Sequence, residues 1–262
     1  MDSGLGLVGY ADALHTLRPD LRLVLSLDPV NMPYGPRSPD EVRRLILASA
    51  LATLPYEPDA VVVACNTASV HGLEALRAEL EPDIPVIGTV PAIRPAAATG
   101  GPVAVWATAA TTSSDYLRGL VDAFAADIET HPIAALGLAE AIESGDSAAV
   151  DECIAYAVSR TPTGVRALVL GCTHYGLVAD RIVAALGGDV TVFDSPLAVA
   201  RQTLRRIGLA PDATAAQGGV EAVLLSGQVG GAPDSWRHYP AGARLLATSA
   251  SAYTLRHEHD AS

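Results

Sequence analysis

Two short segments of the chain each place a cysteine at the end of an apolar run. Cys65 stands in the segment Ala-Cys-Asn-Thr-Ala-Ser, and Cys172 stands in the segment Gly-Cys-Thr-His-Tyr. Each cysteine follows aliphatic and β-branched residues and precedes a stretch with helical spacing, so each is expected at a strand end that faces a helix N-terminus. Such a position favours the thiolate form. The repetition therefore predicts an active site with two thiols.

The elements that must position these thiols alternate between strands and helices. A Ser-Pro pair marks a helix start at Ser38, where Glu41 completes a capping box, and a second Ser-Pro pair starts at Ser195. Alternation at this spacing predicts βαβ units and mostly parallel sheets. The apolar runs that are typical of buried strands are residues 21–27, 60–64, 84–87, 103–106, 167–170 and 190–193.

The two cysteine segments lie 107 positions apart, which is about one small αβ domain. We therefore expect an α/β fold with two pseudo-symmetric αβα lobes, mostly parallel sheets and an active-site cleft between the lobes. The first lobe is expected to comprise residues 1–90 and about 200–262, with Cys65, and the second residues 91–199, with Cys172. Residues 235–240 carry no interpretable motif and are predicted to form a loop.

The composition excludes several kinds of chemistry. Half of the 262 residues are apolar and 5% are aromatic, and all 17 basic residues are arginine. Without lysine there is no Schiff base with pyridoxal phosphate, no phosphate-loop lysine and no lysine nucleophile. The formal net charge of −12 argues against nucleic acid or an anionic membrane as the main partner. A small anionic substrate stays compatible with this charge, because helix N-termini bind carboxylates.

The sequence is that expected of a cytoplasmic protein. No apolar run approaches the roughly 20 residues that span a bilayer, and no basic region followed by an apolar stretch opens the chain. The three cysteines include no close pair, which argues against a disulfide framework and for reduced thiols.

The motifs together resemble those of glutamate racemases, which belong to the cofactor-independent aspartate/glutamate racemase superfamily. They occur in the expected order and spacing over roughly residues 2 to 200, and the two cysteine motifs together are specific. The resemblance implies interconversion of L- and D-glutamate without any cofactor, in supply of D-glutamate for peptidoglycan. The motifs are Asp2-Ser3-Gly4, Pro33-Tyr34-Gly35 with Ser38, Ala64 to Ser69, Pro85 to Gly88 with Pro91-Ala92-Ile93, Ala107-Thr108 with Thr111, and Gly171 to Tyr175.

The resemblance assigns a role to each thiol. Cys65 would remove the α-proton of D-glutamate and Cys172 that of L-glutamate, and each would return a proton in the opposite direction. Asp2 and His174 would assist proton transfer at the two thiols. Family members dimerise in more than one way, so a homodimer is compatible with the resemblance.

Further site residues follow from the same resemblance. A second family glutamate falls on Glu143, with Glu140 as the alternative, and Asp28 matches an acidic residue that precedes the Pro-Tyr-Gly motif. The residues expected to bind the substrate are Asp2, Ser3, Pro33, Tyr34, Gly35, Asn66, Thr67, Thr108, Thr111, Thr173 and His174.

The chemistry itself explains why two thiols are needed. Racemisation removes a weakly acidic α-proton from one face of a carbon and delivers a proton to the other, so two acid/base groups must flank that carbon. A thiol suits this task because its pKa can be tuned toward neutrality. Without pyridoxal phosphate, the developing carbanion must be stabilised by hydrogen bonds to the substrate carboxylate and by desolvation.

Other interpretations stay open at this stage. A related racemase could act on aspartate or another amino acid. A ligand-binding or regulatory paralogue without turnover is also compatible, because the hydrophobic strand that the resemblance implies before Asp2 is missing and Met1 stands at its last position. A cysteine hydrolase would use one thiol with a histidine. A metal site at Cys172 and His174 lacks a second Cys/His pair with ligand spacing, and the pattern around Cys153 indicates core packing in a helix.

Overall fold

The structure, a computed structural model, describes residues 1–187 and 189–248. The chain forms two compact units. Unit 1 consists of Met1–Gly88 together with the described residues from Pro196 onward, and unit 2 consists of Thr89–Ser195. Cys65 therefore belongs to unit 1, and Cys172 belongs to unit 2.

Unit 1 contains a three-stranded and a two-stranded sheet. In the first sheet β1 pairs in parallel with β8, and β8 pairs antiparallel with β9. In the second sheet β2 and β3 are parallel. The strands are β1 (Arg22–Leu27), β8 (Gly219–Leu225), β9 (Gln228–Gly230), β2 (Val61–Val63) and β3 (Val86–Gly88).

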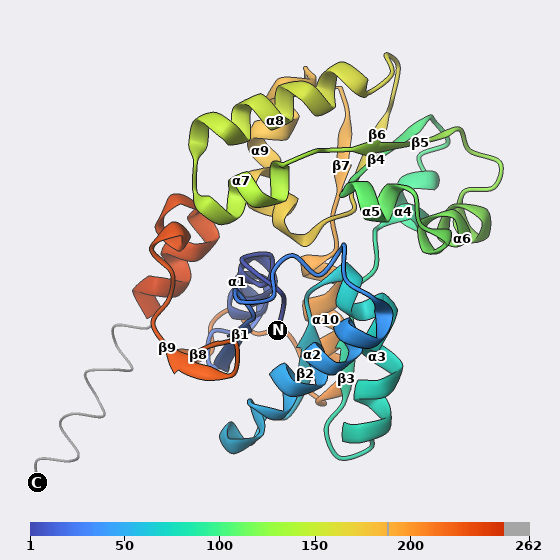
Figure 1. Ribbon diagram of the computed structural model, residues 1–262. Helices are drawn as coiled ribbons and strands as arrows, with labels where there is room; N and C mark the ends of the chain where they lie inside the picture. The colour runs from blue at the N-terminus through green and yellow to red at the C-terminus, as the bar shows by residue number, and fades with distance from the viewer. Residues whose placement is uncertain (188, 249–262) are drawn as a thin grey trace, which may run out of the picture. The chain divides into compact units, whose positions relative to one another are not determined.

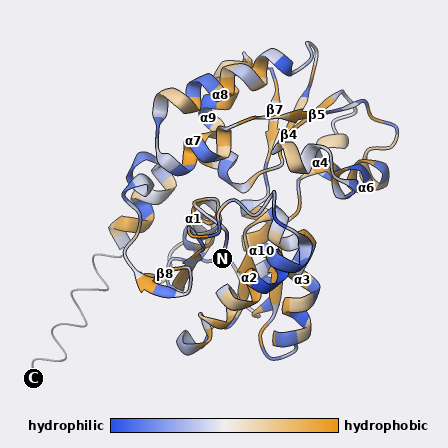
Figure 2. Ribbon diagram, in the orientation of Figure 1, coloured by the Kyte–Doolittle hydropathy of each residue, from blue (hydrophilic) through white to orange (hydrophobic). Residues whose placement is uncertain are grey.

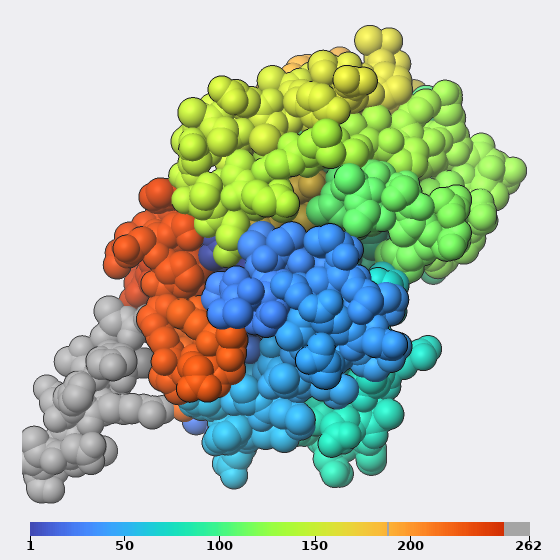
Figure 3. All heavy atoms as spheres, in the orientation of Figure 1, coloured from blue at the N-terminus to red at the C-terminus, as the bar shows by residue number. Residues whose placement is uncertain are grey.

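The helices of unit 1 pack in pairs beside these strands. Helix α2 packs against α3, and α1 packs against α10, while the β8–β9 hairpin forms part of the surface of this unit (Figure 3). The helices are α1 (Leu7–Leu17), α2 (Pro39–Leu51), α3 (Asn66–Leu80) and α10 (Pro196–Arg206), with 3-10 helices η1 (Leu54–Tyr56) and η3 (Asp234–His238) and helical residues 240–248.

Unit 2 is built on one parallel sheet with the strand order β5-β4-β6-β7. Helices α4 and α6 lie on one side of this sheet, and α8 and α9 lie on the other (Figure 1). The strands are β4 (Val103–Ala107), β5 (Thr130–Ala134), β6 (Ala167–Leu170) and β7 (Thr191–Phe193). The helices are α4 (Ile93–Ala97), α5 (Ala109–Thr112), α6 (Asp115–Phe124), α7 (Leu138–Ser144), α8 (Ser147–Arg160) and α9 (Ala179–Leu186), with the 3-10 helix η2 (Thr173–Val178).

The core follows the apolar runs of the sequence. Every residue of β4 and of β6 is buried, as expected for central parallel strands that are covered on both faces. The strands are mostly hydrophobic and the helices have mixed faces (Figure 2). The mixed α/β class with parallel sheets is confirmed, and each predicted strand forms within three residues of its expected bounds.

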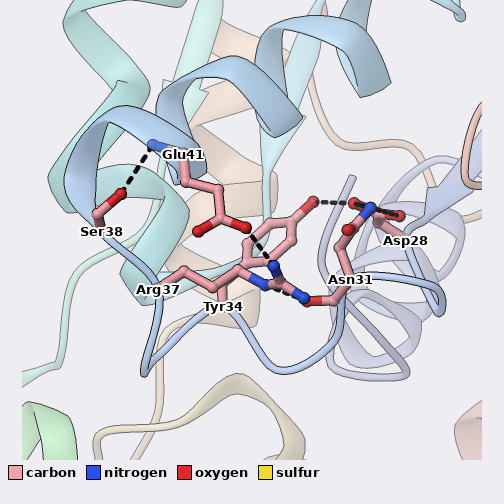
Figure 4. Close-up of polar contacts among 6 residues, drawn as sticks. All are labelled: Asp28, Asn31, Tyr34, Arg37, Ser38 and Glu41. Atoms are coloured by element: carbon pink, nitrogen blue, oxygen red, sulfur yellow. Dashed lines mark hydrogen bonds and ion pairs between the residues drawn. The ribbon is translucent and has the colours of Figure 1, made fainter.

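Some local predictions need correction. Residues 235–240 are not a loop: η3 covers most of them, and Trp236 is fully buried. Burial of this large indole holds the turn in a compact conformation. The capping box at Ser38 is only half formed, because Ser38 Oγ accepts the Glu41 amide at 3.3 Å whereas the Glu41 carboxylate pairs with Arg37 (Figure 4). Within residues 1–187 and 189–248, no helix combines the length and apolarity needed to cross a membrane.

Candidate active site

Cys65 is positioned by the junction of β2 and α3. The residue is the N-cap of α3, with φ −139° and ψ 122°, and it directly follows the end of β2. Its side chain is buried in the apolar cluster that also contains Tyr34, Val63 and Ala68. The thiol therefore lies at the positive end of the α3 dipole in a site that is shielded from water.

Asp2 and Ser3 lie beside the carboxyl ends of β1 and β2, and Cys65 follows β2. The Asp2 amide donates to the Ser26 carbonyl at 3.1 Å, and the Ala64 amide donates to the Met1 carbonyl at 2.9 Å. The Asp2 carboxylate accepts the Ser3 amide at 2.7 Å, and both residues are buried. Backbone pairing thus places Asp2 beside the segment that carries the first thiol.

The Pro33-Tyr34-Gly35 segment is held by the buried carboxylate of Asp28 (Figure 4). This carboxylate accepts hydrogen bonds from the Tyr34 hydroxyl at 2.8 Å and from the Asn31 side-chain amide at 3.0 Å. Burial, together with the bond to Asp28, raises the pKa of Tyr34 well above its usual range. Because the Tyr34 hydroxyl is committed to Asp28, this segment can offer a ligand its backbone groups.

The remaining candidates of unit 1 lie in the first turn of α3. Asn66 is buried and Thr67 is half-buried, and both directly follow Cys65. Amides in the first turn of a helix have no intrahelical acceptors and commonly bind anions. The turn that carries the first thiol therefore also provides groups suited to a carboxylate.

The second thiol is linked to a histidine and a glutamate. Cys172 directly precedes η2, after the end of β6, and its Sγ lies 3.8 Å from His174 Nδ1. His174 Nε2 lies 2.8 Å from Glu143 Oε2, and the imidazole is buried. Glu143 belongs to α7, which packs against η2. The carboxylate therefore orients the imidazole toward the thiol.

Glu140 occupies a different place on the same helix. It lies one turn before Glu143 and is exposed, and it acts electrostatically on Tyr175 and Cys153. Burial raises the pKa of Tyr175 far above its usual range. Of the two glutamates considered from the sequence, Glu143 is the one that the structure pairs with His174.

Thr108 and Thr111 lie at the carboxyl end of β4, the neighbour of β6. Thr108 is the N-cap of the short helix α5, and the two hydroxyl groups are 3.0 Å apart. The Gly171 amide donates to the Trp106 carbonyl at 2.7 Å, which aligns the ends of the two strands. Thr173, in the first turn of η2, extends the same polar edge.

The series of Cys172, His174 and Glu143 in unit 2 is compatible with two kinds of thiol chemistry. A thiol, an imidazole and a carboxylate in series can exchange a proton with a substrate carbon, and the same series can activate a nucleophilic thiol. Within the part of the chain that the structure describes, no group of three His, Cys, Asp or Glu side chains is placed to hold a metal ion. Comparison with known proteins distinguishes the two thiol chemistries.

The profile of the Asp/Glu/hydantoin racemase family matches residues 9–203. The chain belongs to this racemase family. A glutamate racemase from Pseudomonas entomophila is 38% identical over 213 residues, which cover 79% of this chain and 80% of that protein. The crystal structure of Escherichia coli glutamate racemase with L-glutamate and the activator UDP-MurNAc-Ala has a TM-score of 0.75 at 31% identity, covering 84% and 85% of the two chains.

A further solved relative supports the same grouping. Glutamate racemase from Thermus thermophilus, in complex with β-chloro-D-alanine, has a TM-score of 0.67 at 28% identity and covers 94% of this chain and 90% of that chain. The resemblance to glutamate racemases is confirmed, and this racemase is an isomerase.

Two residues that donate to the Asp28 carboxylate were missed in the sequence. Asn31 and Ser226 both donate to Asp28, Ser226 through its Oγ at 2.6 Å. Ser226 lies in the β8–β9 turn with φ +48°, almost 200 positions from Asp28. The Ser226-Gly227 pair signals a turn in the sequence, but nothing in the sequence indicates which loop this turn contacts in the folded racemase.

Proposed function

We propose that the protein interconverts L- and D-glutamate by a two-base mechanism in which Cys65 and Cys172 are the acid/base groups. Cys65 would remove the α-proton of D-glutamate, and Cys172 would remove that of L-glutamate. The proposal is supported most by one shared feature: each unit carries a cysteine at the end of a parallel strand, immediately before a helical segment.

The neighbouring residues suit this division of labour. His174, held by Glu143, can accept the proton of the Cys172 thiol and return it. Asp2, at the strand end beside Ala64, is proposed to do the same for Cys65. Carboxylates of the substrate would be bound by hydroxyl and amide groups. The proposed binding residues are Ser3, Pro33, Tyr34, Gly35, Asn66, Thr67, Thr108, Thr111 and Thr173.

We further propose that the D-glutamate supplies peptidoglycan synthesis in the cytoplasm and that the protein forms a homodimer. The cytoplasmic location is supported by the three cysteines without a close pair. The homodimer rests on the family resemblance, and its mass in solution can be measured by light scattering.

The experiment that tests the mechanism follows isotope exchange and optical rotation together. The protein is incubated in deuterium oxide with L-glutamate or D-glutamate, and α-proton loss is recorded by NMR. We expect exchange and racemisation in both directions, and racemisation should fall by at least about a hundredfold in Cys65→Ser and in Cys172→Ser. Exchange should fall as much for D-glutamate in Cys65→Ser and for L-glutamate in Cys172→Ser. Cys153→Ser is the matched control, because Cys153 lies on α8 and belongs to neither cysteine segment, and it should retain activity.

Each competing interpretation predicts another result. An aspartate racemase would turn over aspartate faster than glutamate. A paralogue without turnover would bind glutamate and exchange no α-proton. A cysteine hydrolase would depend on one thiol far more than on the other and would accumulate an acyl-enzyme.

A further inference from the structure

The hydroxyl of Ser226 joins the β8–β9 turn to residues 28–37, which follow β1 and which we call the Asp28 loop. Strands β1 and β8 are parallel, with Leu27 opposite Leu225 at their carboxyl ends. The next residues, Asp28 and Ser226, therefore emerge at the same edge of the sheet. The Ser226 amide donates to the Leu27 carbonyl at 2.7 Å, and Ser226 Oγ donates to Asp28 Oδ1 at 2.6 Å. The same Oγ accepts the Val30 amide at 3.3 Å.

Ser226 differs in origin from the other donors to Asp28. Among the residues that the structure describes, three side chains donate to this buried carboxylate. Asn31 and Tyr34 belong to the Asp28 loop itself, so their bonds fold the loop onto its own carboxylate (Figure 4). Ser226 lies 198 positions away. Of the three donors, it is therefore the one that ties the carboxylate to the C-terminal part of unit 1.

The Asp28 loop carries the Pro33-Tyr34-Gly35 segment. The Tyr34 hydroxyl donates to Asp28 Oδ2 at 2.8 Å, whereas Ser226 donates to the other oxygen of the same carboxylate. The Tyr34 side chain is buried in the apolar cluster that contains Cys65. The orientation of the Asp28 carboxylate therefore determines where the Tyr34 hydroxyl lies, and with it the backbone on either side of Tyr34.

The surroundings of Asp28 make each donor important. Asp28 is only 2% exposed, so a lost donor is not readily replaced by water. Val30 is 77% exposed, so its side chain contributes little packing to the Asp28 loop. Without the Ser226 hydroxyl, the carboxylate would turn toward its remaining donors and shift Tyr34.

We propose that Ser226 is a positioning residue of this racemase: its hydroxyl, acting through Asp28, holds the Pro33-Tyr34-Gly35 segment in the geometry that binds the substrate carboxylate. The inference rests on the proposed function, in which this segment binds glutamate. A displacement of about 1 Å can cost a hundredfold in a binding or catalytic step. Because the displaced groups bind the substrate and do not transfer its proton, the hydroxyl should affect KM more than kcat.

The backbone at Ser226 allows the hydroxyl to be separated from the turn. Ser226 has φ +48°, in the left-handed region, which glycine adopts without strain and alanine does not. Ser226→Ala removes the hydroxyl and keeps the strain, whereas Ser226→Gly removes the hydroxyl and relieves the strain. A residue that only shapes the turn would tolerate glycine. A positioning residue should show the same rise in KM in both variants.

The test measures racemisation kinetics of the full chain with L-glutamate and with D-glutamate. We expect KM to rise at least about fivefold in Ser226→Ala and in Ser226→Gly, with kcat within about twofold of the parent value. Thr203→Ala is the control, because it also removes a hydroxyl from unit 1, one that donates to the Val199 carbonyl of α10 at 2.9 Å, and its KM should not change. A parent KM in Ser226→Gly would overturn the proposal.

A double-mutant cycle tests whether the effect passes through Tyr34. Tyr34→Phe removes the hydroxyl that Asp28 holds and keeps the ring. In this background, Ser226→Gly should raise KM by less than about twofold, because the connection that it breaks is already lost. A further rise as large as the one in the parent would show that Ser226 acts by another route, and it would refute the proposal.

Hydrogen exchange gives a readout that does not depend on turnover. Peptides that cover residues 30–36 should exchange at least about tenfold faster in Ser226→Gly than in the parent, and unchanged protection would contradict the positioning role. The two proposals fail in different ways. If the parent does not racemise glutamate but Ser226→Gly loosens the Asp28 loop, the proposed function is wrong and Ser226 still positions the loop. If the parent racemises glutamate and both Ser226 variants keep its KM, only the positioning role is refuted.

Discussion

At the scale of single residues, the second thiol depends on groups that are distant in sequence. His174 follows Cys172 by two positions, whereas Glu143 lies 31 positions before His174 and reaches it only through the packing of α7 on η2. The sequence indicates the cysteine and the histidine by their spacing. It cannot decide between Glu143 and Glu140, because both lie on the same short helix and only tertiary packing selects one.

Replacing Glu143 by Gln tests this selection. The amide keeps the shape of the side chain but loses the charged acceptor that orients His174, so we expect kcat for L-glutamate to fall about tenfold to a hundredfold with little change in KM. Glu140 lies one turn earlier on α7 and is exposed, so Glu140→Gln should keep a kcat close to that of the parent enzyme. Steady-state kinetics of both variants provide the measurement, and an equal loss in both would contradict the role of Glu143.

Ser226 is the second residue whose importance only the structure reveals. Its hydroxyl donates to the buried Asp28 carboxylate at 2.6 Å, so Ser226→Ala leaves that carboxylate short of a donor. We expect a loss of about 1–3 kcal/mol in the free energy of unfolding. Ser159→Ala is the control, because Ser159 is exposed and donates only to a carbonyl of its own helix. Urea titrations of the two variants should therefore differ, and matching midpoints would argue against the Asp28 contact.

At the scale of elements, the strands that are buried on both faces are the ones that the sequence predicts best. β4 and β6 are continuous apolar runs and were predicted nearly to the residue, because a central parallel strand is buried on both faces. β5 was missed because it contains Thr130, His131 and Pro132, a composition that only an edge strand tolerates. β8 was also missed, and its pairing with β1, almost 200 positions away, is a tertiary property that no local pattern indicates.

The close approach of β6 to β4 determines where Cys172 lies. A Cβ at Gly171 would stand 2.9 Å from the Trp106 carbonyl oxygen and 3.0 Å from Ala107 Cβ, and these are atoms that cannot easily move. Gly171→Ala should therefore displace the neighbouring thiol and lower kcat at least about tenfold. Gly119→Ala on α6, where an added Cβ meets nothing within 4 Å, should leave kcat unchanged and slightly raise Tm. An unchanged kcat in Gly171→Ala would show that the ends of β4 and β6 accommodate the added Cβ without displacing the thiol.

At the scale of the whole molecule, the chain builds two units that each contain a thiol at a strand end. The repetition of the cysteine segments indicates this organisation from the sequence alone. The discontinuous make-up of unit 1 comes from α10 and β8, which return to the first part of the chain and pack against α1 and pair with β1. The strands of unit 1 form two separate sheets, and the buried α-ammonium of Met1 donates to the Val62 carbonyl of β2. The stability of the molecule is therefore sensitive to the charge on Met1.

That sensitivity predicts a pH dependence of folding. Burial lowers the pKa of the Met1 α-ammonium from its ordinary value of 8.0 to about 6. The unfolded chain therefore binds more protons than the folded protein between these values, and the free energy of unfolding should rise from pH 6 to pH 8. Integration over this window gives an increase of about 2 kcal/mol. Denaturant titrations at both pH values measure it.

The control for this prediction is the same protein with its α-amino group acetylated. Acetylation removes the titrating charge but leaves every histidine and carboxylate in place, so subtracting its pH dependence isolates the contribution of Met1. We expect the acetylated protein to lose the rise that is due to Met1. If both proteins gain the same free energy between pH 6 and pH 8, the α-ammonium is solvated in the folded state, and its burial does not lower its pKa.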